Sequence, residues 1–108
     1  MCHIPGMQVT SSFQLVDVFG SGPYLGNPLA VLRLEADAAT GELQSLTRWM
    51  NLSETAFVLP PTMPGADYRV RIFTPDRELP FAGHPTLGSC HAWLEAGGQP
   101  RTPGQVVQ

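Results

Sequence analysis

The sequence of 108 residues has no lysine, only two cysteines and no long apolar run, and each shortage excludes a class of function. Its six basic residues are all arginines, scattered along a chain of net charge −3, so no basic stripe for nucleic acid is present. No apolar run approaches the ~20 residues of a membrane-spanning helix, and the first residues have neither region of a signal peptide. We therefore predict a cytoplasmic protein that binds neither nucleic acid nor membrane.

The few cysteines and histidines predict neither a disulfide nor a metal site. Cys2 falls in a leader without periodicity and Cys90 in an apolar helix, so we expect reduced thiols. His84 and His91 are seven residues apart in sequence. On a helix this separates them by two turns (~10 Å), too far for two ligands of one metal. The sequence predicts no bound metal.

Hydrophobic periodicity predicts one small domain of mixed strands and helices. Residues 1–12 show no pattern and are expected to be a flexible leader. Alternation, or apolar character on both faces, predicts strands over residues 13–19, 29–34, 53–59 and 68–73. An apolar stripe predicts a helix over residues 41–50; it consists of Leu43, Leu46, Trp49 and Met50.

The most apolar element is a helix predicted over residues 85–96. No formally charged residue occurs in its middle, and apolar side chains spread around most of its circumference. A helix that is apolar on nearly every side is buried, so we expect a sheet to wrap around it and leave its N-terminus at Gly83 and His84 open. The predicted fold class is α+β: a curved, mostly antiparallel sheet around a central helix, with the helix over 41–50 packed outside.

Glu54 is the first candidate for chemistry. It follows the end of a helix and opens a strand, flanked by Ser53 and Thr55. Partial desolvation there would raise its pKa and suit it to proton transfer near neutral pH. The competing interpretation is a gatekeeper at a strand edge that faces water, as most glutamates do.

His84 is the second candidate. It stands at the N-terminus of the apolar helix, where backbone N–H groups and the helix dipole attract anions. It would then orient or protonate an anionic substrate. The alternative is that His84 only occupies the cap of a helix that Pro85 starts.

The remaining polar and aromatic residues have structural explanations. Asp17 lies on an apolar strand face and needs a partner, and Asn27 precedes Pro28 in a turn. Three residues are expected in the core: Trp49, Trp93 and His91. Two arginines are expected to be exposed on one face of a strand: Arg69 and Arg71.

Five blocks of sequence occur in an order that is typical of a known family. The blocks are Asp17-Val-Phe19, Gly26-Asn-Pro-Leu-Ala-Val31, Met50-Asn-Leu-Ser-Glu-Thr55, Arg71-Ile-Phe-Thr-Pro75 and Glu78-Leu-Pro-Phe-Ala-Gly-His-Pro-Thr-Leu-Gly88. Residues 13–108, which contain them, resemble the N-terminal half of the PhzF-like isomerases of phenazine biosynthesis, relatives of diaminopimelate epimerase. A single block of this kind would not be specific, whereas five in order are.

The resemblance implies two similar domains, each a curved sheet around a central helix, with the active site between them. It implies a cofactor-independent isomerase or epimerase that transfers protons on a small carboxylate-bearing substrate, best known for isomerising a dihydro-hydroxyanthranilate. The acid/base glutamate of the family falls on Glu54 and its histidine on His84. The substrate-binding helix mouth falls on Gly83, Pro85 and Thr86. Homodimers are common among family members.

The resemblance covers only the N-terminal half of the family, so we expect the second domain to be missing from these residues. Residues 13–108 would then be a truncated N-terminal domain that carries half of a two-sided site. We expect such a half to be inactive as an isomerase unless a second copy or another chain supplies the opposite wall. Two alternatives stay open: a non-catalytic binding or dimerisation module that keeps the fold, and a truncated fragment without a function of its own.

Overall fold

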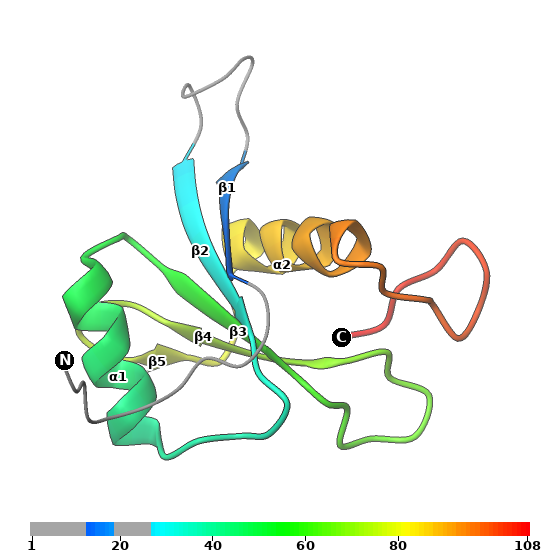
Figure 1. The fold of residues 1–108 in the computed structure, drawn as a ribbon, viewed down its shortest axis with the longest axis horizontal. Helices are drawn as coiled ribbons and strands as arrows, with labels where there is room; N and C mark the ends of the chain where they lie inside the picture. Colours follow the sequence, from blue (N-terminus) through cyan, green and yellow to red (C-terminus); the bar gives the residue numbers. More distant parts are fainter. Residues whose placement is uncertain (1–12, 19–26) are drawn as a thin grey trace, which may run out of the picture.

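The computed structural model describes residues 13–18 and 27–108, and its elements follow the sequence pattern (Figure 1). The strands are β1 (Phe13–Val18), β2 (Asn27–Arg33), β3 (Thr55–Leu59), β4 (Arg69–Phe73) and β5 (Glu78–Leu79). The helices are α1 (Thr40–Met50) and α2 (Gly83–Glu95). The expected leader, Phe19 and the turn up to residue 26 lie outside the described residues, as do the side chains of Asn27 and His84.

The strands form one sheet in the order β1-β2-β3-β4-β5. Among these strands only β2 and β3 pair in parallel, because α1 provides the crossover between them; the other neighbours pair antiparallel. The predicted mixed fold with a mostly antiparallel sheet is therefore confirmed. The two-residue strand β5 was not predicted, since so short a segment has no detectable period.

Each face of the sheet is covered by one helix, and Figure 1 shows α1 and α2 on opposite sides. Successive residues of a strand point to opposite faces, so the core divides into two clusters. The cluster beneath α1 contains Ala30, Leu32, Leu34, Leu43, Phe57, Leu59 and Phe73. The cluster beneath α2 contains Val18, Leu29, Val31, Ala56, Val58, Tyr68, Ala92 and Trp93. This alternation also decides which polar residues of β3 and β4 face which helix.

Helix α2 is less enclosed than its composition predicts. Trp93 is buried, as expected, but Leu87 and Leu94 are 56% and 46% exposed. The reason is that strands β1 to β4 contact α2 from one side only. The prediction of a core position for His91 is wrong, because this residue lies on the exposed side of α2.

The prediction of a core position for Trp49 is also wrong, since this residue is 82% exposed. Helix α1 directs Leu43 and Thr47 into the core, and both have no exposed surface. At ~100° per residue, Trp49 lies ~120° around the helix from Leu43. Helix α1 ends at Asn51, which has the left-handed backbone (φ 56°, ψ 37°) that asparagine tolerates at a helix end.

Arg71 is buried, contrary to the expectation that both arginines of this strand are exposed. The side chain of Arg71 is 8% exposed, whereas that of Arg69 is 41% exposed. Both point to the α1 face of the sheet, where Asp37 and Glu78 cover Arg71 and bind its guanidinium. The period-two pattern predicted that both arginines share one face of the sheet. It could not predict that the segment containing Asp37 covers Arg71.

The C-terminal residues are held by Asp67 rather than by a strand. Residues 102–105 form an isolated antiparallel bridge, between Thr102 and Gln105. The Asp67 carboxylate accepts hydrogen bonds from the backbone N–H groups of Arg101 and Val107, both at 2.7 Å. These two hydrogen bonds lower the pKa of the Asp67 carboxyl.

The lowered pKa of Asp67 predicts a pH-dependent contribution to stability. A carboxyl whose pKa is lower in the folded state stabilises the fold above its unfolded value of about 3.9, and this contribution is lost as pH falls further. We expect Asp67→Asn to lower the urea midpoint at pH 7, with a difference from the native chain that narrows by pH 3. Asp76→Asn is the control, because no hydrogen bond to the Asp76 carboxylate occurs among the described residues. A difference that is the same at both pH values would contradict the prediction.

Candidate active site

Glu54 lies at the same end of the sheet as the start of α2. It directly precedes β3, whose first residue, Thr55, pairs with Ala30 of β2. One residue before Ala30, Leu29 lies against Gly88 in the first half of α2. The C-terminal half of α2 packs instead over the far end of β3, where Trp93 meets Val58. The helix therefore begins above the end of the sheet that Glu54 occupies.

Glu54 also lies on the α2 side of the sheet. In β3, Ala56 and Val58 face α2, whereas Phe57 and Leu59 face α1. Continuing this alternation back by two residues from Ala56 puts Glu54 on the α2 side. Glu54 is half-buried, and β3 is the middle strand, so Glu54 is not at an edge of the sheet. The gatekeeper interpretation does not fit this position.

The start of α2 has the features of an anion-binding helix N-terminus. Ala82, the N-cap, has extended backbone (φ −156°, ψ 137°) and no side chain that can cap the helix. No acidic residue occurs in the first turn. Gly83 is exposed, and its Cα faces open space. The positive end of the helix dipole is therefore not neutralised by an acidic or capping side chain of this turn.

The other two predicted binding residues shape this helix mouth. Pro85 is fully buried and anchors the first turn in the core. The Thr86 hydroxyl donates a hydrogen bond to the carbonyl oxygen of Ala82 at 2.8 Å, so the side chain closes the turn from within. Among the predicted site residues, Glu54 and the backbone of residues 83–86 lie at one end and on one face of the sheet. The side chain of His84 is outside the described part of the chain.

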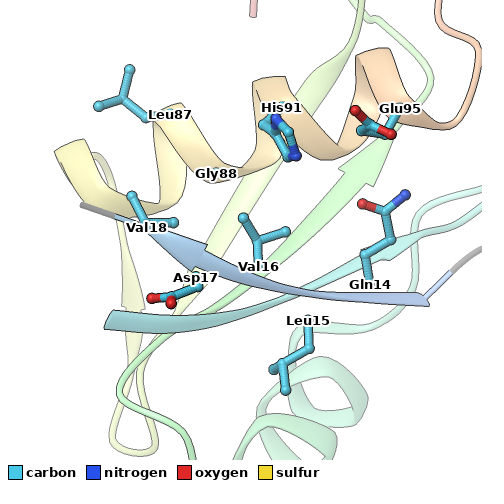
Figure 2. A pocket seen from close by; sticks show the side chains of 9 residues that line it. All are labelled: Gln14, Leu15, Val16, Asp17, Val18, Leu87, Gly88, His91 and Glu95. Carbon is cyan, nitrogen blue, oxygen red and sulfur yellow. The ribbon is translucent and has the colours of Figure 1, made fainter. Parts of the chain in front are cut away.

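One groove among the described residues lies away from this site. It has a volume of about 560 Å³ and lies between β1 and α2, where Figure 2 shows Gln14, Val16 and Val18 directed toward the helix. Leu15 and Asp17 point away from α2 in the same view, so Asp17 is exposed and needs no buried partner.

That groove offers little catalytic chemistry. On the helix side it is lined by His91 and Glu95, which are both exposed. It contains neither Glu54 nor the first turn of α2. We therefore base the candidate site on the end and face of the sheet that Glu54 shares with the start of α2, and not on the size of a groove. The sequence predicted a core position for His91 because the exposed and buried faces of this helix have similar composition.

A second groove of about 480 Å³ extends from the helix mouth along β4. Its lining includes Thr86, Phe81, Ile72 and Tyr68. Burial raises the pKa of the Tyr68 phenol well above its ordinary value, and the Gln108 side chain donates a hydrogen bond to its oxygen. Tyr68 therefore stays protonated at neutral pH and is not a candidate for the base.

Residues 13–18 and 27–108 contain neither a metal-binding cluster nor a membrane-spanning helix. No group of three or more histidine, cysteine, aspartate or glutamate side chains is arranged there to hold a metal ion. Neither α1 nor α2 has the length and apolar character that crossing a membrane requires.

Known proteins resemble this chain in sequence and in structure. A family model described as "Phenazine biosynthesis-like protein" matches residues 16–108. Antisense-enhancing sequence 1 of Schizosaccharomyces pombe is 52% identical over 86 residues, which are 80% of this chain and 29% of that protein. The trans-2,3-dihydro-3-hydroxyanthranilate isomerase of Pseudomonas aeruginosa is 52% identical over 81 residues, which are 74% of this chain and 28% of that enzyme.

Solved structures agree with the sequence relatives. A phenazine biosynthesis protein of the PhzF family from Enterococcus faecalis superposes with a TM-score of 0.69 at 35% identity, covering 77% of this chain and 31% of the other. The chain thus spans about three tenths of the length of the proteins that it matches.

Proposed function

The chain belongs to the phenazine biosynthesis-like family, and on that premise we propose that it forms one wall of the active site of a cofactor-independent isomerase. The substrate is a small molecule with a carboxylate, of the dihydro-hydroxyanthranilate class on which the Pseudomonas aeruginosa relative is named to act. The observation that carries the proposal is that Glu54 and the mouth of α2 lie at one end and on one face of the sheet.

In the proposed reaction the substrate carboxylate binds at the first turn of α2, beside Gly83 and Thr86, with Pro85 holding that turn in place. Glu54, as carboxylate, removes a proton from a carbon of the substrate. The same proton, now on Glu54, is then returned to another carbon of the same molecule, with His84 as the partner in this transfer. The reaction is a proton shift within one molecule, so it needs no oxidant and no co-reactant.

The opposite wall of the site must come from outside the described residues. A second copy of this chain, or the further length that its relatives possess, would supply it. For the chain alone, the site is open to water, which competes for the substrate and weakens the electrostatic contacts. We therefore expect little isomerase activity from the isolated chain.

A chimera tests this proposal without requiring the isolated chain to be active. The segment of the Pseudomonas aeruginosa isomerase that matches this chain is replaced by the corresponding residues of this chain. We expect the chimera to isomerise trans-2,3-dihydro-3-hydroxyanthranilate within about tenfold of the parent rate, because the wall is chemically equivalent. A chimera that folds, as judged by circular dichroism, but has no activity would reject the proposed function.

A further inference from the structure

Arg71 forms the most extensive side-chain hydrogen-bond cluster among the described residues. Its Nε and Nη2 atoms donate to the two carboxylate oxygens of Glu78, at 2.9 and 2.7 Å. Nη1 donates to the Asp37 carboxylate at 2.9 Å and to the Ala38 carbonyl oxygen at 3.2 Å, and Nη2 also donates to the Thr40 hydroxyl at 2.8 Å. All five N–H groups of the guanidinium are thus used. We call Arg71, Asp37, Thr40 and Glu78 the Arg71 clasp.

The clasp joins two segments that are far apart in sequence. Asp37, Ala38 and Thr40 form the entry to α1, and the chain that leaves α1 runs directly to Glu54. Glu78 lies in β5, which is separated from the mouth of α2 only by residues 80–82. Each of the two candidate site elements therefore follows one of the two segments that Arg71 holds.

Two more contacts fix α1 to the same hairpin. The Gln44 side chain donates to the carbonyl oxygen of Thr74 at 2.7 Å, and the Arg48 guanidinium donates to that of Pro75 at 2.9 Å. Helix α1 is therefore tied to the β4–β5 hairpin at its start, middle and end. The position of the residues after α1 then depends on the position of that hairpin.

Strand β5 needs a side-chain anchor because it is short. Its two residues pair only with Ile72 and Phe73 of β4. A two-residue pairing has few backbone hydrogen bonds to set the direction in which the chain leaves the sheet. The paired, parallel hydrogen bonds between Arg71 and Glu78 supply a second, directional connection at this point.

We propose that Arg71 is a positioning residue that sets the placement of Glu54 relative to the mouth of α2. This inference rests on the proposed function, which gives Glu54 and the start of α2 their roles. The hydrogen bonds of the Arg71 clasp do not depend on that function. Arg71 touches no substrate in this account. It acts by holding the entry of α1 and strand β5 on one rigid group.

The fork geometry of arginine, and not its charge alone, is required for this role. Lysine at this position would keep the positive charge between Asp37 and Glu78 but could not reach five acceptors in one plane. If Arg71 only balanced the charge of its partners, the Arg71→Lys variant would behave like the native chain. This difference makes the lysine variant the informative one.

The test uses nuclear magnetic resonance of the full 108-residue chain. We expect Arg71→Lys to shift the backbone amide signals of Gly83 and Thr86 and the side-chain carboxyl signal of Glu54, while the indole signal of buried Trp93 stays in place. Arg69→Gln is the matched control, since it removes the exposed partner of Asp37 on the same strand. Changes confined to residues 37–40 and 78 would overturn the proposal.

A second variant is available if the Trp93 signal shows that the Arg71→Lys chain is unfolded. Glu78→Gln removes the same connection at a more exposed group, and the same signals then decide the question.

The active chimera supplies a kinetic measurement. We expect Arg71→Lys to lower kcat by about 10- to 100-fold, because small displacements of reacting groups have effects of this size, with KM within about threefold. Equal kcat values for the Arg71→Lys and unchanged chimeras would also overturn the proposal. If the chimera that retains Arg71 is itself inactive, the proposed function is rejected instead. The magnetic resonance result then still decides whether Arg71 sets the placement of Glu54 relative to the start of α2.

Discussion

Replacing Glu54 with glutamine in the active chimera is expected to lower kcat by about 10²- to 10⁴-fold, the usual contribution of a positioned acid/base group. The amide keeps the shape of the side chain but cannot take up and return a proton. KM should stay within a few-fold, because the proposed binding of the substrate carboxylate is to the first turn of α2 and not to Glu54. Steady-state rates, together with deuterium incorporation from heavy water into the substrate, measure both expectations.

The matched control is Glu35→Gln, which makes the same chemical change at an exposed glutamate near the opposite end of the sheet. It should leave kcat and KM unchanged. If Glu54→Gln were as active as this control, Glu54 would not be the acid/base group, and the non-catalytic module would become the better description of the chain.

Replacing Gly88 with valine is expected to destabilise the fold by about 3 kcal/mol, the upper part of the range for overfilling a packed core. A Cβ atom at Gly88 would lie 2.3 Å from Cδ2 of Leu29 and 2.9 Å from Cγ2 of Val18, both in the core. Leu29 has no exposed surface, so its side chain could shift only by disturbing other core contacts. Helix α2 would have to lift from the sheet, and the free energy of unfolding in urea would fall.

Gly41→Val provides the comparison, because a Cβ atom at Gly41 of α1 would have no neighbour within 4 Å. Glycine and valine differ in helix propensity by less than about 0.5 kcal/mol, so the stability of this variant should stay near that of the native chain. Equal stability of the two variants would show that α2 does not pack on Leu29 as closely as the structure has it.

The elements that sequence predicts best are those with a local cause. The helix over residues 41–50 depends on neighbours in sequence, and it is confirmed as α1 although one member of its predicted stripe, Trp49, is exposed. The two-residue strand β5 has no such local signal, because its pairing with β4 depends on a turn that brings the two together.

The errors concern burial, which depends on contacts across the fold. Trp49 and His91 belong to faces of their helices that no described element covers, although their sequences suggest a core position. Arg71 shows the opposite error. Its charge predicts exposure, and only the approach of Asp37 and Glu78 from other segments makes its burial favourable.

The candidate site divides in the same way. The sequence by itself determined which residues are suited to proton transfer and anion binding, since Glu54 and the glycine–histidine–proline start of a helix are local features, and it placed the chain in a family by five ordered blocks. Only the tertiary structure decided that Glu54 and the mouth of α2 share one end and one face of the sheet, and that Arg71 connects the segments leading to them. These relations depend on contacts between segments far apart in sequence: the pairing of β2 with β3, the packing of Gly88 against Leu29 and the hydrogen bond of Arg71 to Asp37.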